Sequence, residues 1–482
     1  MSIVFKLAIP SANTNIMLPV KGSVNVTIDW NDGNIISYTS INPSHTYANA
    51  GTYNISLTGS FTQLRNDSPN INYSTYLTGF EYNIQIPALT NFLYAFANTV
   101  NNFTISIANN TITNNVTLMS NMFESSAFNN PLTNLNTSSV TEMEGMFYNA
   151  SAFNQPVSFD TSKVTVISGM FMQASGFNQP LSFNTSNVTD MGGMFQYASR
   201  FNQSLSFSNT SKVIYMIDMF SGATAFNQDI SSWNISSLQY AANMFTNSSF
   251  SSSNYNKLLV SWGNQSIIRN NVILGASNIK YTTSFAKSAR DILTNTYAWN
   301  ITDGGYTAPY PCFKEGSKIL TNNGYKSIET LRTGDLIQTL QNGFKPIYKI
   351  GKRELYHSAL KHRIKEQLYR FSKEKYPEIF EDLVLTGCHS ILVENFENEE
   401  QKQKAIDINS GRLCVTDGRY RLPACLVTKA SIYENPGTYT IYHFALENDD
   451  YIMNYGVYAN GLLVETCSKR YLNEFSGMTI IS

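Results

Sequence analysis

The chain has 482 residues, a formal net charge of −1 and only 14% charged residues, which argues against a protein that binds nucleic acid through net positive charge. Hydrophobic residues make up 42%, with 29 Tyr and 29 Phe, so the composition indicates packed structure rather than disorder. A chain of this length is sufficient for about two to four domains, each with its own core.

The cysteines and the N-terminus indicate where the protein resides. All five cysteines lie in the last 171 residues, at positions 312, 388, 414, 425 and 467, and their spacing matches no zinc site and no small disulfide framework. This odd, one-sided set favours a reducing compartment. The apolar run after Met1 is too short for a signal peptide, and no stretch approaches the roughly 18 apolar residues of a transmembrane helix. The sequence predicts no metal, no cofactor and no membrane span.

Residues 1–85 alternate apolar and polar positions in short runs, such as "SVNVTIDW" and "GTYNISLTGSF", which are separated by turn sequences. The pattern predicts a small antiparallel β-sandwich. The segments "IDWNDG" and "SHTYANAGTYNISLTG" resemble the PKD-type immunoglobulin-like family at Trp30, Asp32, Gly33, His45, Tyr47, Gly51 and Tyr53. The resemblance implies a spacer or binding module, in which His45 and Asp32 fix turns.

Residues 86–305 contain an internal repeat. Met-Phe recurs at 122, 146, 170, 194, 219 and 244, and Phe-Asn follows it at 128, 153, 177, 201 and 226. A fixed period of this size predicts a solenoid, because one unit is too small to bury its own apolar face. We expect two helical turns over 191–198, a strand at "SLSF", a Met-Phe stripe in the core, and Asn and Ser side chains that satisfy backbone groups at the turns.

These units resemble the BspA-like family, related to leucine-rich repeats, most closely in "MFMQASGFNQPLSFNTSNVTDM" and "MFSGATAFNQDISSWNISS". Residues 273–305 resemble the cap that closes such arrays. The resemblance implies a surface that binds a protein or a glycan. Between residues 90 and 262 there are only four Lys or Arg and seven Asp or Glu, so hydroxyl, amide and aromatic groups meet the partner.

After a linker at 306–311 the chain becomes charged and cysteine-bearing. The block "CFKEGSKILTNNGYKSIETLRTGDLIQTL" resembles the opening of the Hint family, the hedgehog and intein autoprocessing fold. The matching positions are Cys312, Gly316, Ser317, Gly324, Ile328, Glu329, Leu331, Gly334 and Asp335. The resemblance implies an all-β domain over 312–470, followed by a tail at 471–482.

Three roles are open for Cys312: a buried structural thiol, half of a disulfide, or a nucleophile directed at its own backbone. The cysteine count and the compartment disfavour the disulfide. Moving the acyl group of residue 311 onto sulfur needs groups that hold the oxyanion and protonate the leaving amine. In the Hint family a Thr-x-x-His turn does this, and "LTGCHSILV" supplies Thr386 and His389 at that spacing.

The segment "IYHFALENDDYIMNYGVYANGLLVETC" resembles the last intein block but departs from it. Glu465-Thr466 stands where an intein has His-Asn, and Thr has no side-chain amide that could close a succinimide, so splicing is not expected. A thioester at Cys312 is then open to attack by water, by another thiol such as Cys467 or by an outside nucleophile. His443 replaces the usual Asp, and the rigid prolyl carbonyl of Pro311 predicts slow cleavage.

The predicted architecture is multidomain and mainly β with short helices: an Ig-like sandwich (1–85), a leucine-rich-repeat-like solenoid (86–305) and a Hint domain (312–470) with a charged helical insert at 351–383. Two functions stay open. One is an interaction or adhesion protein whose Hint domain cleaves the Pro311–Cys312 bond without splicing. The other is a structural virion or surface assembly protein with an inert Hint domain. The combination resembles proteins of large DNA viruses, which implies a place in the host-cell cytoplasm or the virion.

Overall fold

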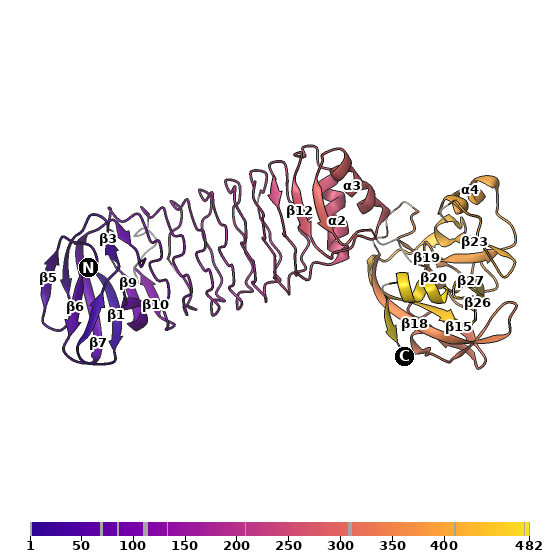
Figure 1. Cartoon of the computed structure of the whole chain (residues 1–482), viewed down its shortest axis with the longest axis horizontal. Coiled ribbons are helices and arrows are strands. Elements are labelled where there is room, and N and C mark those ends of the chain that lie inside the picture. The colour runs from indigo at the N-terminus through magenta and orange to yellow at the C-terminus, as the bar shows by residue number, and fades with distance from the viewer. Residues whose placement is uncertain are drawn as a thin grey trace. The chain divides into compact units, whose positions relative to one another are not determined.

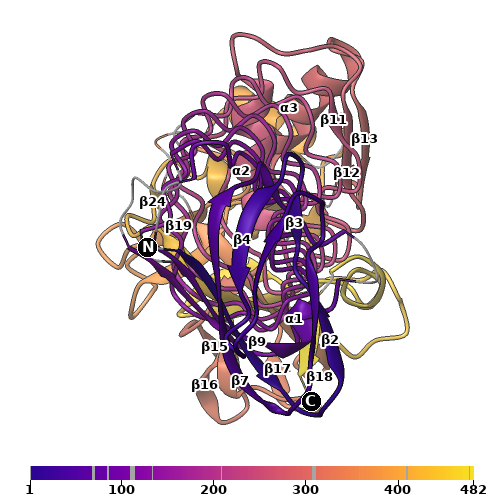
Figure 2. The same cartoon turned by 90° about the vertical axis from the view of Figure 1, so that its left-hand side faces the viewer.

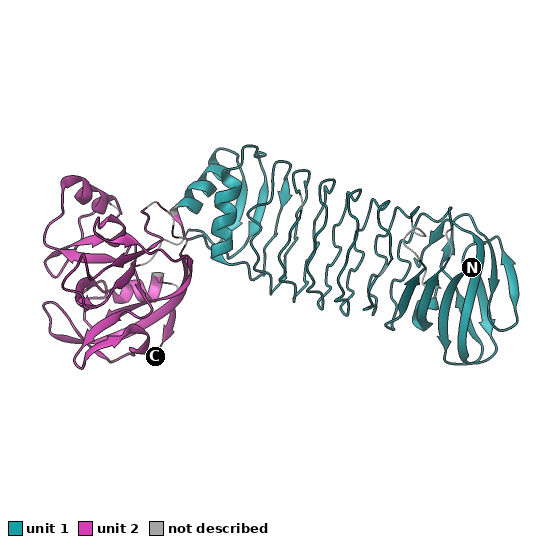
Figure 3. Cartoon of the chain, turned by 180° about the vertical axis from the view of Figure 1, so that it is seen from behind, with its two compact units in different colours: residues 1–281, 285–306 teal, residues 282–284, 307–482 magenta. Residues whose placement is uncertain are grey.

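The computed structural model describes residues 2–67, 71–83, 86–108, 114–132, 134–207, 209–306, 311–357, 359, 361, 363–408, 411–476 and 478–481. Four residues of the predicted linker, 307–310, lie outside this set. The chain forms two compact units, of which the first comprises residues 1–281 and 285–306 and the second residues 282–284 and 307–482 (Figure 3). The chain is mainly β, as predicted, and no helix in the described part is long and apolar enough to cross a bilayer.

The first unit begins with a β-sandwich (Figure 1). Its elements are β1 (Ile3–Ile9), β2 (Thr14–Met17), β3 (Val20–Lys21), β4 (Asn25–Asp29), β5 (Ile35–Tyr38), β6 (Ser44–Tyr47), β7 (Gly51–Ser60), β8 (Gln63–Leu64), α1 (Tyr73–Tyr76), β9 (Leu77–Tyr82) and β10 (Thr104–Ile107). The main sheet has the order β10-β9-β1-β7-β4-β5. Trp30 is fully buried, and its carbonyl oxygen accepts a hydrogen bond of 2.9 Å from the Tyr47 hydroxyl. His45 contacts Asp32 at 2.6 Å, as expected of turn-fixing residues.

The sandwich continues directly into the solenoid. Isolated parallel bridges link residues 63, 91, 118, 142, 166, 190, 215 and 240 in turn, so one ladder starts in β8 and runs through every coil to β11 (Tyr240–Ala241). One hydrophobic core fills both parts. The far end carries α2 (Ser252–Gly263), β12 (Ile273–Ala276), α3 (Ser284–Asn295) and β13 (Asn300–Asp303). Figure 2 looks along the stack, with the sandwich in front of the coils.

Phenylalanines build the solenoid core. The Phe residues of the Met-Phe pairs stack face to face at centroid distances of 5.3–5.9 Å from coil to coil. The Phe residues of the Phe-Asn pairs form a second stack at 6.0–6.2 Å. The Asn residues that follow them form a ladder, in which each side-chain oxygen accepts from a backbone amide of the next coil. The Asn178 backbone amide donates to Asn154 Oδ1 at 2.9 Å, and the Asn202 backbone amide donates to Asn178 Oδ1 at 3.0 Å. The predicted core stripe and side-chain bonding at turns are therefore confirmed.

The helical turns expected over 191–198 are wrong. The Met194 amide bonds back to Met191, but the amides of Gly193 and Phe195 donate across to the next coil. Gly193 and Tyr197 adopt φ values of +60° and +57°, which an α-helix does not contain. Bonds between coils replace the helix because each coil gains partners on both sides. The predicted strand at "SLSF" is reduced to a single bridge between Leu181 and Leu205.

The described strands of the second unit form one sheet, in which two long strands are accompanied by many short ones. Its elements are β14 (Phe313–Lys314), β15 (Lys318–Thr321), β16 (Gly324–Ser327), η1 (Ile328–Thr330), β17 (Leu336–Gln338), β18 (Phe344–His357), β19 (Leu368–Phe371), β20 (Leu383–Thr386), β21 (Ser390–Val393), α4 (Glu399–Ile408), β22 (Val415–Thr416), β23 (Arg419–Pro423), η2 (Ala424–Leu426), β24 (Ser431–Ile432), β25 (Gly437–Leu446), β26 (Gly456–Ala459), β27 (Leu462–Glu465), η3 (Tyr471–Phe475) and β28 (Thr479–Ile481).

The helical insert predicted at 351–383 is also wrong. Strand β18 runs through the start of that segment and pairs with β25 along almost its whole length, and β19 and β20 occupy part of the rest. Pairing with a long neighbouring strand outweighs the local helix propensity of charged residues. The helical insert of this unit is α4 instead, which begins at Glu399.

Candidate active site

Cys312 lies fully buried at the entrance to β14, where two other strands meet. Strand β14 pairs with β20 on one side and with β25 on the other. The Cys312 amide donates to Thr386 Oγ1 at 2.8 Å, and the Cys312 carbonyl oxygen accepts from the Thr386 amide at 3.0 Å. Thr386 therefore holds the amide that a shift at residue 311 would release.

His389 follows Thr386 in a tight turn, because its amide donates to the Thr386 carbonyl at 2.9 Å. The ring is fully buried, and the Phe313 ring lies 4.3 Å away, centroid to centroid. His389 Nε2 lies 3.1 Å from the Glu465 carbonyl oxygen, which assigns the proton to Nε2. In the described part of the chain Nδ1 has no hydrogen-bond partner.

Burial controls the protonation of the site. It lowers the pKa of His389 to about 3, against the smaller opposite effect of the Glu465 and Cys312 backbone carbonyls. It raises the pKa of the Cys312 thiol to about 12, with Arg353 acting weakly in the other direction. At neutral pH the site therefore contains a neutral imidazole and a protonated thiol. Any attack by the thiol needs a base to take its proton.

Cys467 completes the set of residues predicted from the sequence. It is buried in the same apolar cluster as Cys312, and its Sγ donates to the Phe444 carbonyl at 3.2 Å. Burial raises the pKa of the Cys467 thiol, and the neighbouring Cys312 raises it further. All five cysteines are free thiols. The structure brings Cys312, Thr386, His389 and Cys467 into one buried site.

Comparison with known proteins supports a two-part architecture. The family model described as "Hint domain" matches residues 311–469. The model described as "Mycoplasma protein of unknown function, DUF285" matches residues 90–183 and 181–287. The chain therefore combines a repeat region that matches the DUF285 model with a segment that matches the Hint domain.

Two solved structures of intein or intein-like domains are similar to about a third of the chain. A crystal structure of the gp41-1 intein has 12% identity and a TM-score of 0.19, and it covers 32% of this chain and 98% of its own. The solution structure of a bacterial intein-like domain from Clostridium thermocellum has 18% identity and a TM-score of 0.20, with 32% and 97% coverage. The search of curated proteins gave no match.

The Hint domain contains a second buried histidine that sequence reasoning did not count as a site residue. Phe313 pairs with Tyr442, so His443 lies one step along β25, beside Cys312. Both ring nitrogens of His443 lack a hydrogen-bond partner among the described residues, and the ring lies 5.1 Å from that of His389. Burial, and then the neighbouring His389, lower its pKa well below the usual value. The pairing register, once known, would have revealed it.

The end of the Hint domain is fixed by structural contacts. Glu465 forms an ion pair of 3.1 Å with Arg421, and Thr466 Oγ1 accepts from the Tyr455 amide at 2.9 Å. Asn460 and Gly461 form the two-residue turn between β26 and β27, with φ values of +48° and +99°. Asn460 Oδ1 also accepts from the Lys318 amide at 2.6 Å. Asn460 is therefore a turn residue.

Proposed function

We propose that this protein is an interaction-type repeat protein whose Hint domain cleaves the Pro311–Cys312 bond through an N-to-S acyl shift, without splicing. The observation that carries the proposal is the 2.8 Å hydrogen bond from the Cys312 amide to Thr386 Oγ1, next to a buried neutral His389. It fixes the scissile amide beside a base. The Hint match over 311–469 begins at the residue before that bond.

The first step rearranges the chain without gain or loss of atoms. Cys312 Sγ attacks the carbonyl carbon of Pro311, a C–S bond forms and the C–N bond breaks. The proton lost by the thiol ends on the Cys312 nitrogen, which becomes an amine. Only attack on the resulting thioester separates residues 1–311 from the rest. Water gives a carboxylic acid, hydroxylamine a hydroxamate, and an added thiol a new thioester.

Each site residue has a distinct role in this proposal. His389 Nδ1 accepts the thiol proton and returns it to the departing amine. Thr386 positions the amide through its hydroxyl oxygen. Cys467 is an internal acceptor that shares the apolar cluster of Cys312. Thr466 cannot cyclise, since it lacks an amide, so a fragment that begins at Cys312 stays intact.

An inert Hint domain is the second candidate, and two observations favour it. The Cys312 thiol is fully buried with its pKa raised to about 12, so very little thiolate exists at neutral pH. The scissile carbonyl belongs to Pro311, whose ring restricts the approach of a nucleophile. In this case the protein is a structural virion or surface assembly protein, and the Hint domain is a folded terminal module.

The two candidates separate by intact mass. The purified full-length chain of 54.0 kDa is incubated at neutral pH with and without hydroxylamine or dithiothreitol. Self-cleavage predicts two fragments that part between Pro311 and Cys312, faster with either reagent. Cys312→Ala abolishes them, whereas Cys414→Ala, a half-buried cysteine of the same unit, leaves them unchanged. A chain that stays whole for days in both reagents contradicts the proposal and leaves the inert domain.

The other parts complete the proposal. The solenoid over 86–305 supplies the binding surface, for a protein or a glycan, because its coils expose polar and aromatic side chains around a sealed phenylalanine core. The N-terminal sandwich, whose main sheet extends to β10, is a PKD-like spacer or binding module. The placement in the virion or in the cytoplasm of a host cell rests on the combination of domains. A pull-down with the full-length chain that recovers neither host-surface nor virion components contradicts the binding role.

A further inference from the structure

One face of the solenoid concentrates its negative charge. We define the acidic face as residues 118–124, 142–148, 166–172, 190–196 and 215–221, which are equivalent segments of successive coils. Five of the seven Asp and Glu residues between 90 and 262 lie there, at positions 124, 142, 144, 190 and 218. None of the four basic residues of that region does, since they are at 163, 200, 212 and 257. Most acidic residues of this region therefore lie on one face of the solenoid, and the basic residues lie elsewhere.

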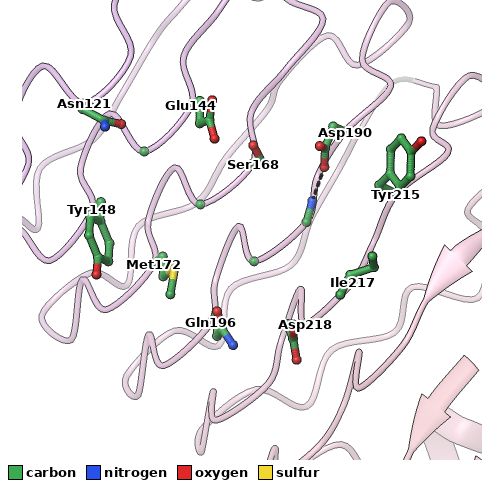
Figure 4. A pocket seen from close by; sticks show the side chains of 14 residues that line it. Asn121, Glu144, Tyr148, Ser168, Met172, Asp190, Gln196, Tyr215, Ile217 and Asp218 are labelled. Carbon is green, nitrogen blue, oxygen red and sulfur yellow. Dashed lines mark hydrogen bonds between the residues drawn. The ribbon is translucent and has the colours of Figure 1, made fainter. Parts of the chain in front are cut away.

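A groove of about 500 Å³ runs along the acidic face (Figure 4). Its floor is a column of three glycines, at positions 145, 169 and 193, whose φ values are +58°, +61° and +60°. Asn121 and Asp218 hold the equivalent position in the flanking coils with similar positive φ values, so the backbone itself does not require glycine. A Cβ atom on Gly169 would meet nothing closer than 3.9 Å. Gly169 and Gly193 therefore leave the floor open, whereas a Cβ atom on Gly145 would lie 2.2 Å from Asn121 Oδ1.

An aromatic wall closes one end of the groove. Tyr215 stacks on Tyr240 at 5.3 Å with the rings 7° apart, so one of its faces is covered. In the preceding coil the equivalent residue is Asp190, which is joined to Tyr215 by a parallel bridge and is too small to cover the other face. Figure 4 shows the Tyr215 ring beside Asp190. The groove thus ends in a tyrosine ring that lies next to a carboxylate.

The lining favours a cation over a neutral ligand. Glu144, Asp190 and Asp218 line the groove, and no Lys or Arg is among the described lining residues. Carboxylates attract a cation and hydrogen-bond it, and the face of a tyrosine ring adds a cation–π contact. A neutral sugar would use the ring but would gain little from three carboxylates. A cationic group carried on a chain that crosses successive coils uses all of these features.

We propose that the groove binds an extended segment of a partner protein through its arginine or lysine side chains. This proposal rests on the interaction role of the solenoid proposed above and specifies its ligand. The volume is within the range of about 300–1,000 Å³ of ligand sites in proteins, which is sufficient for a few side chains rather than a whole domain. Specificity then lies in the spacing of positive charges, which has to match the spacing of the coils.

The test uses the full-length chain and a fluorescein-labelled peptide of alternating glycine and arginine, measured by fluorescence anisotropy. The variant is Glu144→Gln combined with Asp190→Asn. Asparagine keeps the local fold, because Asn91 occupies the same position in an earlier coil and its Oδ1 accepts from the Leu93 amide, as Asp190 Oδ1 does from Gly192. We expect the affinity to fall about tenfold for each carboxylate removed.

The matched control is Asp160→Asn, which removes one charge outside the acidic face. Asn184 holds the equivalent position in the next coil and caps the same turn, so the fold is kept. The control should bind the peptide as the wild type does. An equal loss of affinity per carboxylate removed in the control and in the groove variant would show nonspecific attraction and overturn the proposal.

Three further outcomes overturn it. They are wild-type protein that does not bind the arginine peptide, a groove variant with unchanged affinity, and a neutral gluco-oligosaccharide that displaces the peptide. None of these contradicts the wider interaction role, which fails only if the full-length chain recovers no partner in the pull-down. The two proposals therefore fail in distinguishable ways.

Discussion

The buried histidine His443 should make the Hint domain sensitive to acid, and His443→Phe should remove part of that sensitivity. The side chain is fully buried, and both of its ring nitrogens lack hydrogen-bond partners among the described residues. Its pKa is lowered well below the usual value, first by burial and then by His389. Phenylalanine has a ring of similar size and carries no titratable group.

The sign and size of the effect follow from linkage. The unfolded chain protonates this imidazole below pH 6.5, whereas the folded chain keeps it neutral, so stability is full above pH 6.5 and falls as the pH decreases. For one histidine that stays neutral in the fold, the loss is negligible at pH 7.5 and about 2 kcal/mol at pH 5.0. His389, with its pKa lowered to about 3, adds a similar loss that remains in the variant.

The cysteines provide an assay specific for this domain, because all five lie after residue 311. The reactivity of the buried Cys425 toward dithiodipyridine is followed against urea concentration at both pH values, in the full-length chain. The free energy of unfolding of the wild type should fall by about 2 kcal/mol more than that of His443→Phe between pH 7.5 and pH 5.0.

Tyr471→Phe is the matched control, since the Tyr471 ring lies 6.4 Å from that of His443 and a phenol does not titrate in this range. It should keep the wild-type pH dependence. The reasoning is refuted if wild type and His443→Phe lose the same free energy between the two pH values. That result would mean that His443 binds its proton equally well in the folded and unfolded chain.

Three other predictions concern the core, a turn and the site. Phe171→Ala removes a ring that is stacked between two others at centroid distances of 5.5 and 5.8 Å. The free energy of unfolding of the first unit should therefore fall by about 3–5 kcal/mol. It is measured by tryptophan fluorescence, since all four tryptophans precede residue 307. Gly461→Ala should destabilise the Hint domain much more than Gly324→Ala in the cysteine assay: both have positive φ, but only at Gly461 would a Cβ atom meet a backbone oxygen at 2.3 Å. Thr386→Val removes the acceptor of the Cys312 amide and should slow fragment formation about 100-fold, measured by intact mass.

The solenoid was predictable because its repeat has one dominant physical cause. A phenylalanine that returns every 24 or 25 residues has to stack on its own copies, and the sequence alone therefore predicted the core. The path of the backbone between the stacked rings was not predictable. The segment 191–198 has the composition of a short helix, yet its alternate amides bond to the next coil, a choice that depends on neighbours absent from any one unit.

The prediction of a helical insert at 351–383 was wrong for the same reason, since a distant segment decides the local structure. Its alternating charges favour a solvated helix when the segment is considered alone. In the fold, Lys352 pairs with Tyr442 and Glu354 with Thr440, because β25 lies alongside and offers a full row of backbone partners. A strand that is nearly 90 residues away in sequence decides the local structure, and no local pattern contains that information.

The candidate site shows which of its residues a sequence motif can identify. Cys312, Thr386 and His389 were identified because each lies in a short sequence motif that resembles part of the Hint family. The pairing of β14 with β20, which brings Cys312 to Thr386, joins residues 74 apart in sequence and is not contained in either motif. His443 was seen only as a departure from the usual residue, because its meaning depends on register. Strand β14 pairs Phe313 with Tyr442, which sets His443 beside Cys312, and His389 packs against it at 5.1 Å. In the proposed cleavage, a proton that moves from the Cys312 thiol to a neighbouring neutral imidazole leaves the net charge of the buried site unchanged. Such a site tolerates deep burial, and for that reason a thiol with a pKa of about 12 is compatible with slow attack on the chain that precedes it.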